Sequence, residues 1–345
     1  MNPAVSVVIV NHNGIDFVDT CLRTVLNSNY TNFEVIFVDN ASTDGSLEYA
    51  QNNFANDTRL RFVENPVSFG PAVGRNKGAD ISKGKYLVFL DNDTKVEKNF
   101  LFEFVKALEE DNSIGSGQAK LLRMDTKYFF DCAGDCLGPM GFLIERARGA
   151  KDTGQFDYIA DILSAKSAAS IIRRELFERI GGFDEDFYMY LEETDLSWRV
   201  WLAGYRVVFI PNSKVYHAFN TPRKDFKRYY QKYIIKYYGC RNYISTLIKN
   251  LEFRNLIEIL PLHITCWLIL SLFFILKLNF DDSFYILKGI GWNILNIGVL
   301  LKKRSFIKSH IRKFSDSIIL VRVMDKKRIS YYFGKGFAYL RGKPF

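Results

Sequence analysis

Two carboxylates, Asp91 and Asp93, directly follow the apolar run of residues 86–90. Such a run is typical of a strand buried on both faces of a parallel sheet. Residues i and i+2 of an extended chain point to the same side, so both carboxylates can face one point beyond the strand end. This pair suits a hard divalent cation whose other ligands are phosphate oxygens. A solvated Asp-Asn-Asp turn explains the same residues, so the rest of the chain must distinguish the two interpretations.

The elements around this pair indicate a parallel α/β sheet. Residues 4–10 and 33–38 are β-branched apolar runs, followed by the polar segments Asn-His-Asn-Gly and Asp-Asn-Ala-Ser-Thr-Asp-Gly-Ser. Helical patterns over 16–26 and from about residue 47 alternate with them, and 60–64 is a third short strand. Strand–helix alternation predicts a parallel sheet, and such sheets bind ligands outside the carboxyl ends of their strands.

Glycines at positions 70, 74 and 78 recur every four residues in the next predicted helix. They clear one helix face for close packing on the sheet, and Arg75 and Lys77 on the same helix are candidate phosphate partners. The spacing differs from the Gly-x-Gly-x-x-Gly fingerprint, so it does not indicate a dinucleotide site.

A second acidic group begins the helix predicted over 191–203, which ends at Gly204. Glu192, Glu193 and Asp195 lie in its first turn, and Asp195 can also pair with Arg199 four residues later. A strand over 164–173 is expected before this helix and a final strand over 205–210 after it, ending before Pro211. The Gly-rich residues 134–154 are expected to form a loop over the site.

The charge of the chain is divided unevenly along its length. Residues 1–220 carry 23 Lys and Arg against 31 Asp and Glu, whereas residues 221–345 carry 24 against 7. A basic C-terminal region favours an anionic membrane surface or nucleic acid as a partner. The five cysteines are scattered without a zinc-ligand pattern, which favours buried thiols. No basic segment followed by an apolar one begins the chain, so a cytosolic body without a signal peptide is expected.

Two apolar stretches, 259–276 and 284–301, lie in this basic region. Each is at the lower limit of length for a membrane span, and Pro261, His263 and Lys288 raise the cost of deep insertion. Interfacial or re-entrant attachment, a spanning hairpin and a soluble core module remain open.

In their order along the chain, these motifs resemble the family-2 inverting glycosyltransferases of GT-A fold, especially the rhamnosyltransferase-like branch. The resemblance covers about residues 4–217. The segments that carry it are 6–13, 38–46, Asn65, 69–70, 74–78, 91–93, 181–187 and 192–196. It implies an α/β GT-A domain with a mostly parallel sheet over residues 1–220 and a helical, membrane-associated region over 221–345.

The resemblance also implies donor-binding residues, namely Val10, Asn11, His12, Asp39, Asn65, Arg75, Asn76 and Asn92. The first four would hold the nucleoside, and Arg75 and Asn76 would lie near the base or the diphosphate.

The resemblance implies a metal site and a base as well. Asp91, Asp93 and His217 would bind Mg²⁺ or Mn²⁺ bridging the diphosphate. The family usually has Glu-Asp where this chain has Glu192 and Glu193, and the second position is the usual base. Glu193 is therefore the expected base although it is one methylene longer than Asp, and Asp195 is a second candidate.

The implied activity is sugar transfer from a nucleotide-diphosphate sugar to a glycan or polyprenyl-linked acceptor in cell-surface polysaccharide synthesis. The enzyme would act at the cytoplasmic face of the cell membrane, and no nucleic-acid partner is expected. A sugar-nucleotide nucleotidyltransferase is an alternative, although the loop over residues 11–15 lacks the usual Gly-rich, basic sequence. A non-catalytic membrane adaptor would explain the basic region but not the carboxylates.

Overall fold

A computed structural model of the chain describes residues 3–218 and 234–325. Its centre is a mixed sheet with the strand order β10-β12-β6-β11-β4-β1-β2-β3, in which β5 pairs with β12 and β7 with β6. The strands are β1 (Val5–Asn11), β2 (Phe33–Asp39), β3 (Leu60–Glu64), β4 (Tyr86–Asp91), β5 (Thr94–Val96), β6 (Ile114–Arg123), β7 (Phe130–Cys132), β10 (Ala160–Asp161), β11 (Ala169–Arg173) and β12 (Arg206–His217).

The four strands predicted first form a parallel group, as expected. β1 pairs in parallel with β2 and β4, and β2 pairs in parallel with β3. The apolar runs of β1, β2 and β4 are buried on both faces, which explains why these runs are continuous rather than alternating. β11 is antiparallel to both β4 and β6, so the sheet is mixed.

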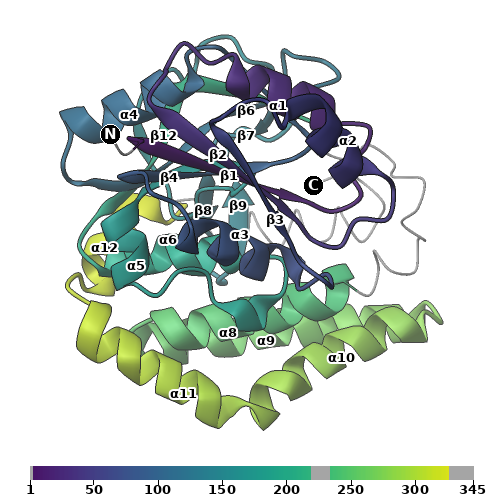
Figure 1. Ribbon diagram of the computed structural model, residues 1–345. Coiled ribbons are helices and arrows are strands. Elements are labelled where there is room, and N and C mark those ends of the chain that lie inside the picture. The colour runs from purple at the N-terminus through teal and green to yellow at the C-terminus, as the bar shows by residue number, and fades with distance from the viewer. Residues whose placement is uncertain (1–2, 219–233, 326–345) are drawn as a thin grey trace.

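Helices cover both faces of the sheet (Figure 1). One hydrophobic cluster contains the apolar sides of α1 (Val18–Leu26), α2 (Ser46–Phe54) and α4 (Phe100–Glu110). The other contains those of α3 (Gly70–Asp80), α5 (Arg174–Arg179) and α6 (Glu192–Leu202). Close packing of α3 is confirmed, since a Cβ atom at Gly78 would lie 2.4 Å from a methyl carbon of Val8.

Two sequence expectations were wrong in detail. β12 does not end before Pro211 but continues to His217, because a register shift between Ile210 and Lys214 accommodates the proline. The Gly-rich segment is not a plain loop, since it contains the antiparallel hairpin of β8 (Asp135–Leu137) and β9 (Leu143–Glu145).

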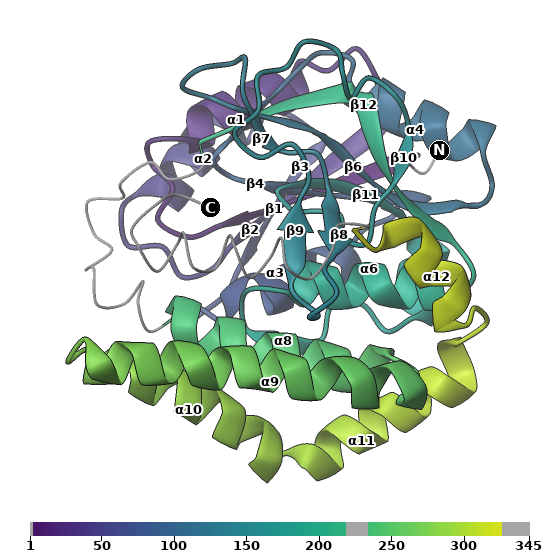
Figure 2. The same ribbon diagram turned by 180° about the vertical axis from the view of Figure 1, so that it is seen from behind.

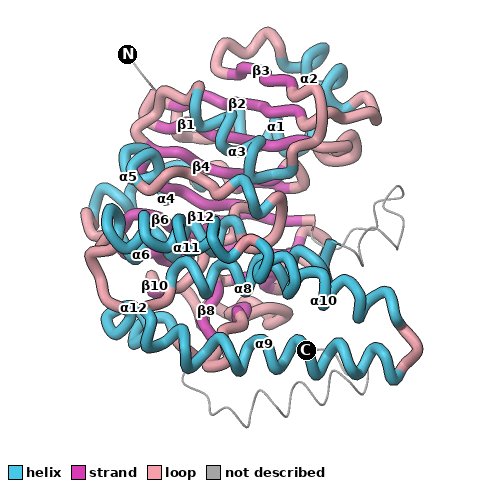
Figure 3. Tube along the Cα trace, turned by 90° about the horizontal axis from the view of Figure 1, so that it is seen from below, coloured by secondary structure: helices cyan, strands magenta, loops and turns pink. Residues whose placement is uncertain are grey.

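The C-terminal region is helical and packs beneath α3 and α6 (Figures 1 and 2). Its helices are α8 (Gly239–Asn250), α9 (Phe253–Leu276), α10 (Phe280–Leu295), α11 (Ile297–Phe306) and α12 (Asp316–Val323). Viewed from below, α9 and α10 form a helical hairpin (Figure 3). Leu247 and Ile259 belong to the same hydrophobic cluster as Val8 and Phe89 of the sheet. The expected domain boundary at residue 220 lies in 219–233, outside the described residues.

Candidate functional site: a carboxylate–histidine metal centre

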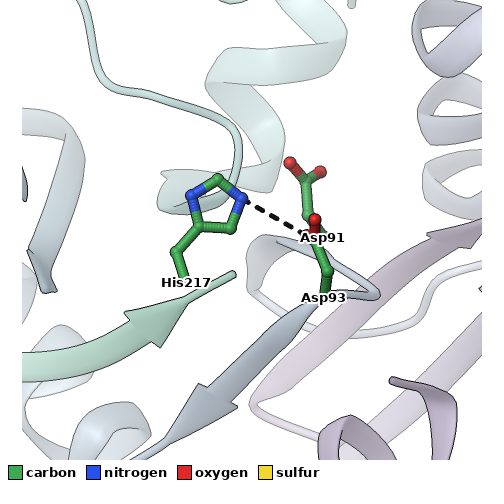
Figure 4. A group of neighbouring side chains, drawn as sticks. All are labelled: Asp91, Asp93 and His217. Carbon is green, nitrogen blue, oxygen red and sulfur yellow. Dashed lines mark ion pairs between the residues drawn. The ribbon is translucent and has the colours of Figure 1, made fainter. Parts of the chain in front are cut away.

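The carboxyl end of β4 meets the end of β12 through the short strand β5. Asp91 is the last residue of β4, and Thr94 of β5 lies opposite His217 in the antiparallel pairing with β12. This pairing brings His217 Nε2 within 3.3 Å of Asp93 Oδ1 (Figure 4). One ligand atom from each of Asp91, Asp93 and His217 lies within 4.8 Å of the others. The three residues expected to bind the metal are therefore brought together.

The chemistry of these donors fits the expected ion. Carboxylate oxygens suit Mg²⁺ and Mn²⁺, and an imidazole nitrogen is acceptable to Mn²⁺. Asp91 and Asp93 are partly exposed whereas His217 is buried, so the carboxylates are the side of the cluster that phosphate oxygens could approach.

The ring of His217 is oriented by an acid that the sequence analysis missed. Its Nδ1 atom lies 2.8 Å from Oδ2 of Asp131, a buried residue of β7. Burial by itself lowers the pKa of His217, but hydrogen bonds to Asp131 and Asp93 outweigh it and raise the pKa to about 10. A cation at Nε2 would displace the proton there and leave Nδ1–H donating to Asp131. In the sequence, the local sign of this role was a single acid between Phe130 and Cys132.

Arg75 links the metal cluster to α6. Its buried guanidinium donates from Nη2 to Asp91 Oδ1 at 2.9 Å and from Nη1 to Glu192 Oε1 at 2.7 Å. Burial, together with the charge of Glu193, raises the pKa of Glu192 to about 7, although Arg75 opposes the shift. The guanidinium expected near the base or diphosphate is thus held between two protein carboxylates.

The two candidate bases have different surroundings. Glu193 is half-buried in the first turn of α6. Asp195 is fully buried, and its carboxylate lies 2.8 Å from Arg199 Nη2 and 2.8 Å from Lys249 Nζ, while Asn250 donates to it at 2.9 Å. These contacts are those of a structural ion pair, so the geometry favours Glu193 as the base.

Several expected donor-binding residues gather where β1, β2 and β4 end. Asn11 Nδ2 donates to Asp39 Oδ1 at 2.8 Å, and Asn92 Nδ2 donates to Asn11 Oδ1 at 2.5 Å. These buried amides tie the strand ends together. Half-buried His12 lies 2.9 Å from the Asn40 carbonyl through Nδ1, and Val10 packs against Gly74 of α3.

The last two residues expected to bind the donor, Asn65 and Asn76, have different surroundings. Asn65 lies beside this group, accepting from Lys77 Nζ at 2.7 Å. Asn76 does not join it, because its side chain both donates to and accepts from the Phe183 backbone at 2.9 Å. Asn76 therefore holds the backbone at Phe183, ahead of the acidic helix, rather than facing the strand ends.

Comparison with known proteins identifies the class of this fold and site. The sequence model of Glycosyl transferase family 2 matches residues 6–181, and the chain belongs to this family. It is 27% identical over 226 residues to the glycosyltransferase GlyG of Streptococcus pneumoniae, covering 63% of this chain and 70% of that protein. It is also 27% identical over 231 residues to the O-antigen biosynthesis protein RfbC of Myxococcus xanthus, covering 64% of this chain but 18% of that protein.

Solved structures agree on the fold. S. aureus TarS 1-349 in complex with UDP-GlcNAc has a TM-score of 0.57 at 16% identity, covering 100% of this chain and 93% of that one. The mannosyltransferase PcManGT of Pyrobaculum calidifontis, in complex with GDP-Man and Mn²⁺, has a TM-score of 0.54 at 16% identity, covering 89% and 86%. The expected GT-A fold with a C-terminal helical region is confirmed.

Proposed function

We propose that this glycosyltransferase inverts the anomeric centre of a sugar as it moves the sugar from a nucleotide diphosphate to a glycan or polyprenyl-linked acceptor. The observation that carries the proposal is the cluster of Asp91, Asp93 and His217 at the carboxyl edge of the sheet, which Arg75 links to Glu192, the neighbour of Glu193. A single displacement at the anomeric carbon requires a group that stabilises the leaving diphosphate, such as a bound metal ion, and a separate carboxylate that accepts the proton of the attacking hydroxyl.

Asp91, Asp93 and His217 would hold a Mg²⁺ or Mn²⁺ ion, which would supply charge stabilisation for the leaving diphosphate. Glu193 accepts the proton of the acceptor hydroxyl as its oxygen bonds to the anomeric carbon. The bond from that carbon to the diphosphate oxygen breaks on the opposite side, so the configuration inverts. His12 and Asp39 line the edge where the nucleoside would lie.

The relatives favour a role in cell-surface polysaccharide synthesis, since RfbC is named for O-antigen biosynthesis. The finer placement in the rhamnosyltransferase-like branch rests on the motif resemblance alone. UDP-GlcNAc and GDP-Man, the donors named with TarS and PcManGT, are therefore tested together with dTDP-rhamnose.

The test is nucleotide release from each of these three donors with Mn²⁺, in the presence of membrane lipid extract as acceptor. Release of the nucleoside diphosphate that Asp93→Ala abolishes would support the proposal. Formation of a nucleoside triphosphate and a sugar 1-phosphate from these donors when pyrophosphate is added would indicate nucleotidyl transfer, and no turnover of any donor would favour a non-catalytic adaptor.

We further propose that α9–α11 attach the enzyme to the cytoplasmic face of a membrane. By length and composition, α9 is the one helix among the described residues that could span a bilayer, and 17% of its apolar window is buried. The exposed apolar side chains of α9–α11 include Leu268, Leu272, Leu276, Phe284, Leu287, Leu295, Val299 and Phe306.

Buried polar side chains lie in these helices beside the apolar Trp267, Ile286 and Leu300. Ser271 and Ser283 approach to 2.7 Å between hydroxyl oxygens, and His263 and Asn293 are also buried. An apolar exterior with hydrogen-bonded polar side chains in the interior is typical of helices that face lipid. The 62° bend between α10 and the helix that follows favours interfacial or re-entrant attachment over a straight hairpin. Flotation with anionic vesicles tests this: a chain that stays soluble and unbound at low salt would contradict it.

A further inference from the structure

The turn that leads into the acidic helix has an unusual backbone. Tyr188, Tyr190 and Leu191 have positive φ angles of 60°, 66° and 67°, and none of them is glycine. L-residues disfavour this region because Cβ crowds the backbone, so it persists only where surrounding contacts hold it. Leu191 directly precedes Glu192 and Glu193, so this turn sets where both carboxylates begin.

One side chain from the C-terminal region holds this turn. Nδ2 of Asn242, on α8, lies 3.0, 2.9 and 2.8 Å from the carbonyl oxygens of Phe187, Met189 and Tyr190. Asn242 is fully buried, and its Oδ1 accepts from Arg241 Nε at 2.9 Å, which fixes the orientation of the amide. Two N–H groups therefore serve three carbonyls of a strained turn.

The opposite side of the turn is closed by α3. A Cβ atom at Gly70 would lie 2.5 Å from the carbonyl oxygen of Tyr188, so the backbones are in close contact. The same helix α8 also reaches the first turn of α6, where Lys249 and Asn250 contact Asp195. Helix α8, which lies below α3 and α6 in Figure 1, therefore contacts both the turn and the start of the helix that carries Glu193.

Helix α8 is in turn hydrogen-bonded to α10, one of the three helices proposed to attach the enzyme to the membrane. Asn293 of α10 donates to the Arg241 carbonyl at 3.0 Å and accepts from Ser245 Oγ at 2.7 Å. A Cβ atom at Gly289 of α10 would lie 3.1 Å from the Arg241 backbone nitrogen. Two buried side-chain amides thus connect α10, through α8, to the turn before the acidic pair.

We infer that Asn242 is a positioning residue for transfer: its amide holds the 187–191 turn so that Glu193 meets the acceptor hydroxyl, and Asn293 anchors the helix that presents it. This inference rests on the proposed role of Glu193. Among the described residues, the hydrogen-bond partners of Asn242 are Arg241 and the backbone of the turn rather than Asp91, Asp93 or His217, so we expect its loss to leave donor binding nearly unchanged.

The test measures kcat and donor KM, with Mn²⁺, for the donor that the wild-type chain turns over fastest among UDP-GlcNAc, GDP-Man and dTDP-rhamnose. Asn242→Ala is expected to lower kcat by about 10- to 100-fold, the cost of misplacing a reacting group by roughly 1 Å, with donor KM unchanged within about twofold. Asn293→Ala is expected to act in the same direction but less. Ser213→Ala, which removes a buried hydrogen bond to the Phe100 carbonyl on the other face of the sheet, is the matched control.

The double variant Asn242→Ala/Glu193→Gln distinguishes positioning of Glu193 from a purely structural role of Asn242. If Asn242 acts through Glu193, the double variant is expected to be no slower than Glu193→Gln alone. An equal further loss in that background, or a wild-type kcat for Asn242→Ala, would overturn the inference. If Asn242→Ala does not fold, Asn242→Ser, which keeps one donor, replaces it under the same criteria. A wild-type chain that turns over no donor would instead refute the proposed function.

Discussion

His217 Nδ1 lies 2.8 Å from Asp131 Oδ2, and this contact leaves Nε2 facing Asp93. An acid that binds the far nitrogen of a histidine fixes the ring and increases its basicity as a ligand. The metal cluster is therefore supported by a residue 86 positions away in the sequence.

Removal of this acid tests the metal site. Asp131→Ala is expected to raise the Mn²⁺ concentration needed for half-maximal activity by about 10- to 100-fold, because His217 loses its orienting acceptor. The measurement is a Mn²⁺ titration of donor turnover. Asp125→Ala, an exposed acid paired with Arg123, is the control and should titrate as the wild type does. An unchanged Mn²⁺ requirement in Asp131→Ala would contradict the assigned role.

The base assignment is tested by Glu193→Gln. This change keeps the side-chain size and removes only the proton acceptor, so kcat is expected to fall by about 10²- to 10⁴-fold. Donor binding, measured by calorimetry with Mn²⁺, should stay within about twofold of wild type. Full activity in this variant would exclude Glu193 as the base.

Asp195→Asn is expected to behave differently, because Asp195 pairs with Arg199 and Lys249 in the interior. Breaking a buried ion pair costs about 3–5 kcal/mol, so the free energy of unfolding should fall by roughly that amount. Urea unfolding in mild detergent measures it. The kcat of the folded fraction should fall far less than in Glu193→Gln, and a variant that is fully stable but as inactive as Glu193→Gln would reverse the two assignments.

Stability should depend on pH through Asp184. Burial by itself raises the pKa of Asp184, but the charges of Lys249 and Lys303 outweigh it and hold the pKa below its usual range. A depressed folded-state pKa stabilises the protein above the unfolded value, near 4, and that stability is lost as pH falls through the folded value. The unfolding free-energy difference between wild type and Asp184→Asn should therefore be largest at pH 7 and shrink below about pH 4. A constant difference from pH 7 to pH 3 would argue against this ion pair.

Membrane attachment through α9–α11 can be tested with substitutions on α9, away from the candidate active site. The double variant Ile269→Ser/Leu272→Ser is expected to reduce binding to anionic vesicles by at least about tenfold, since burying each apolar side chain contributes about 1.5–3 kcal/mol. Co-sedimentation at low salt is the measurement. Phe102→Ser, at an exposed position of α4, is the control and should bind as the wild type does.

The sequence alone determined the elements whose patterns are local. The apolar runs of β1, β2 and β4, the helix signals of α4 and α6, and the polar residues at the strand ends could be read because each depends on neighbours a few positions apart. Parallel strands then bring their carboxyl ends to one edge, so Asp91 and Asp93 could be assigned together before any contact was known.

Only the tertiary structure decided which side chains meet across the fold. The pairing of Arg75 with Glu192 spans 117 positions, and it ties to α6 a guanidinium that the resemblance places near the base or the diphosphate. The bonds of Asn76 to Phe183 and of Asp131 to His217 span 107 and 86 positions. No local period encodes such contacts, because they depend on strand order and on the register of β5, β7 and β12 rather than on neighbours in the chain.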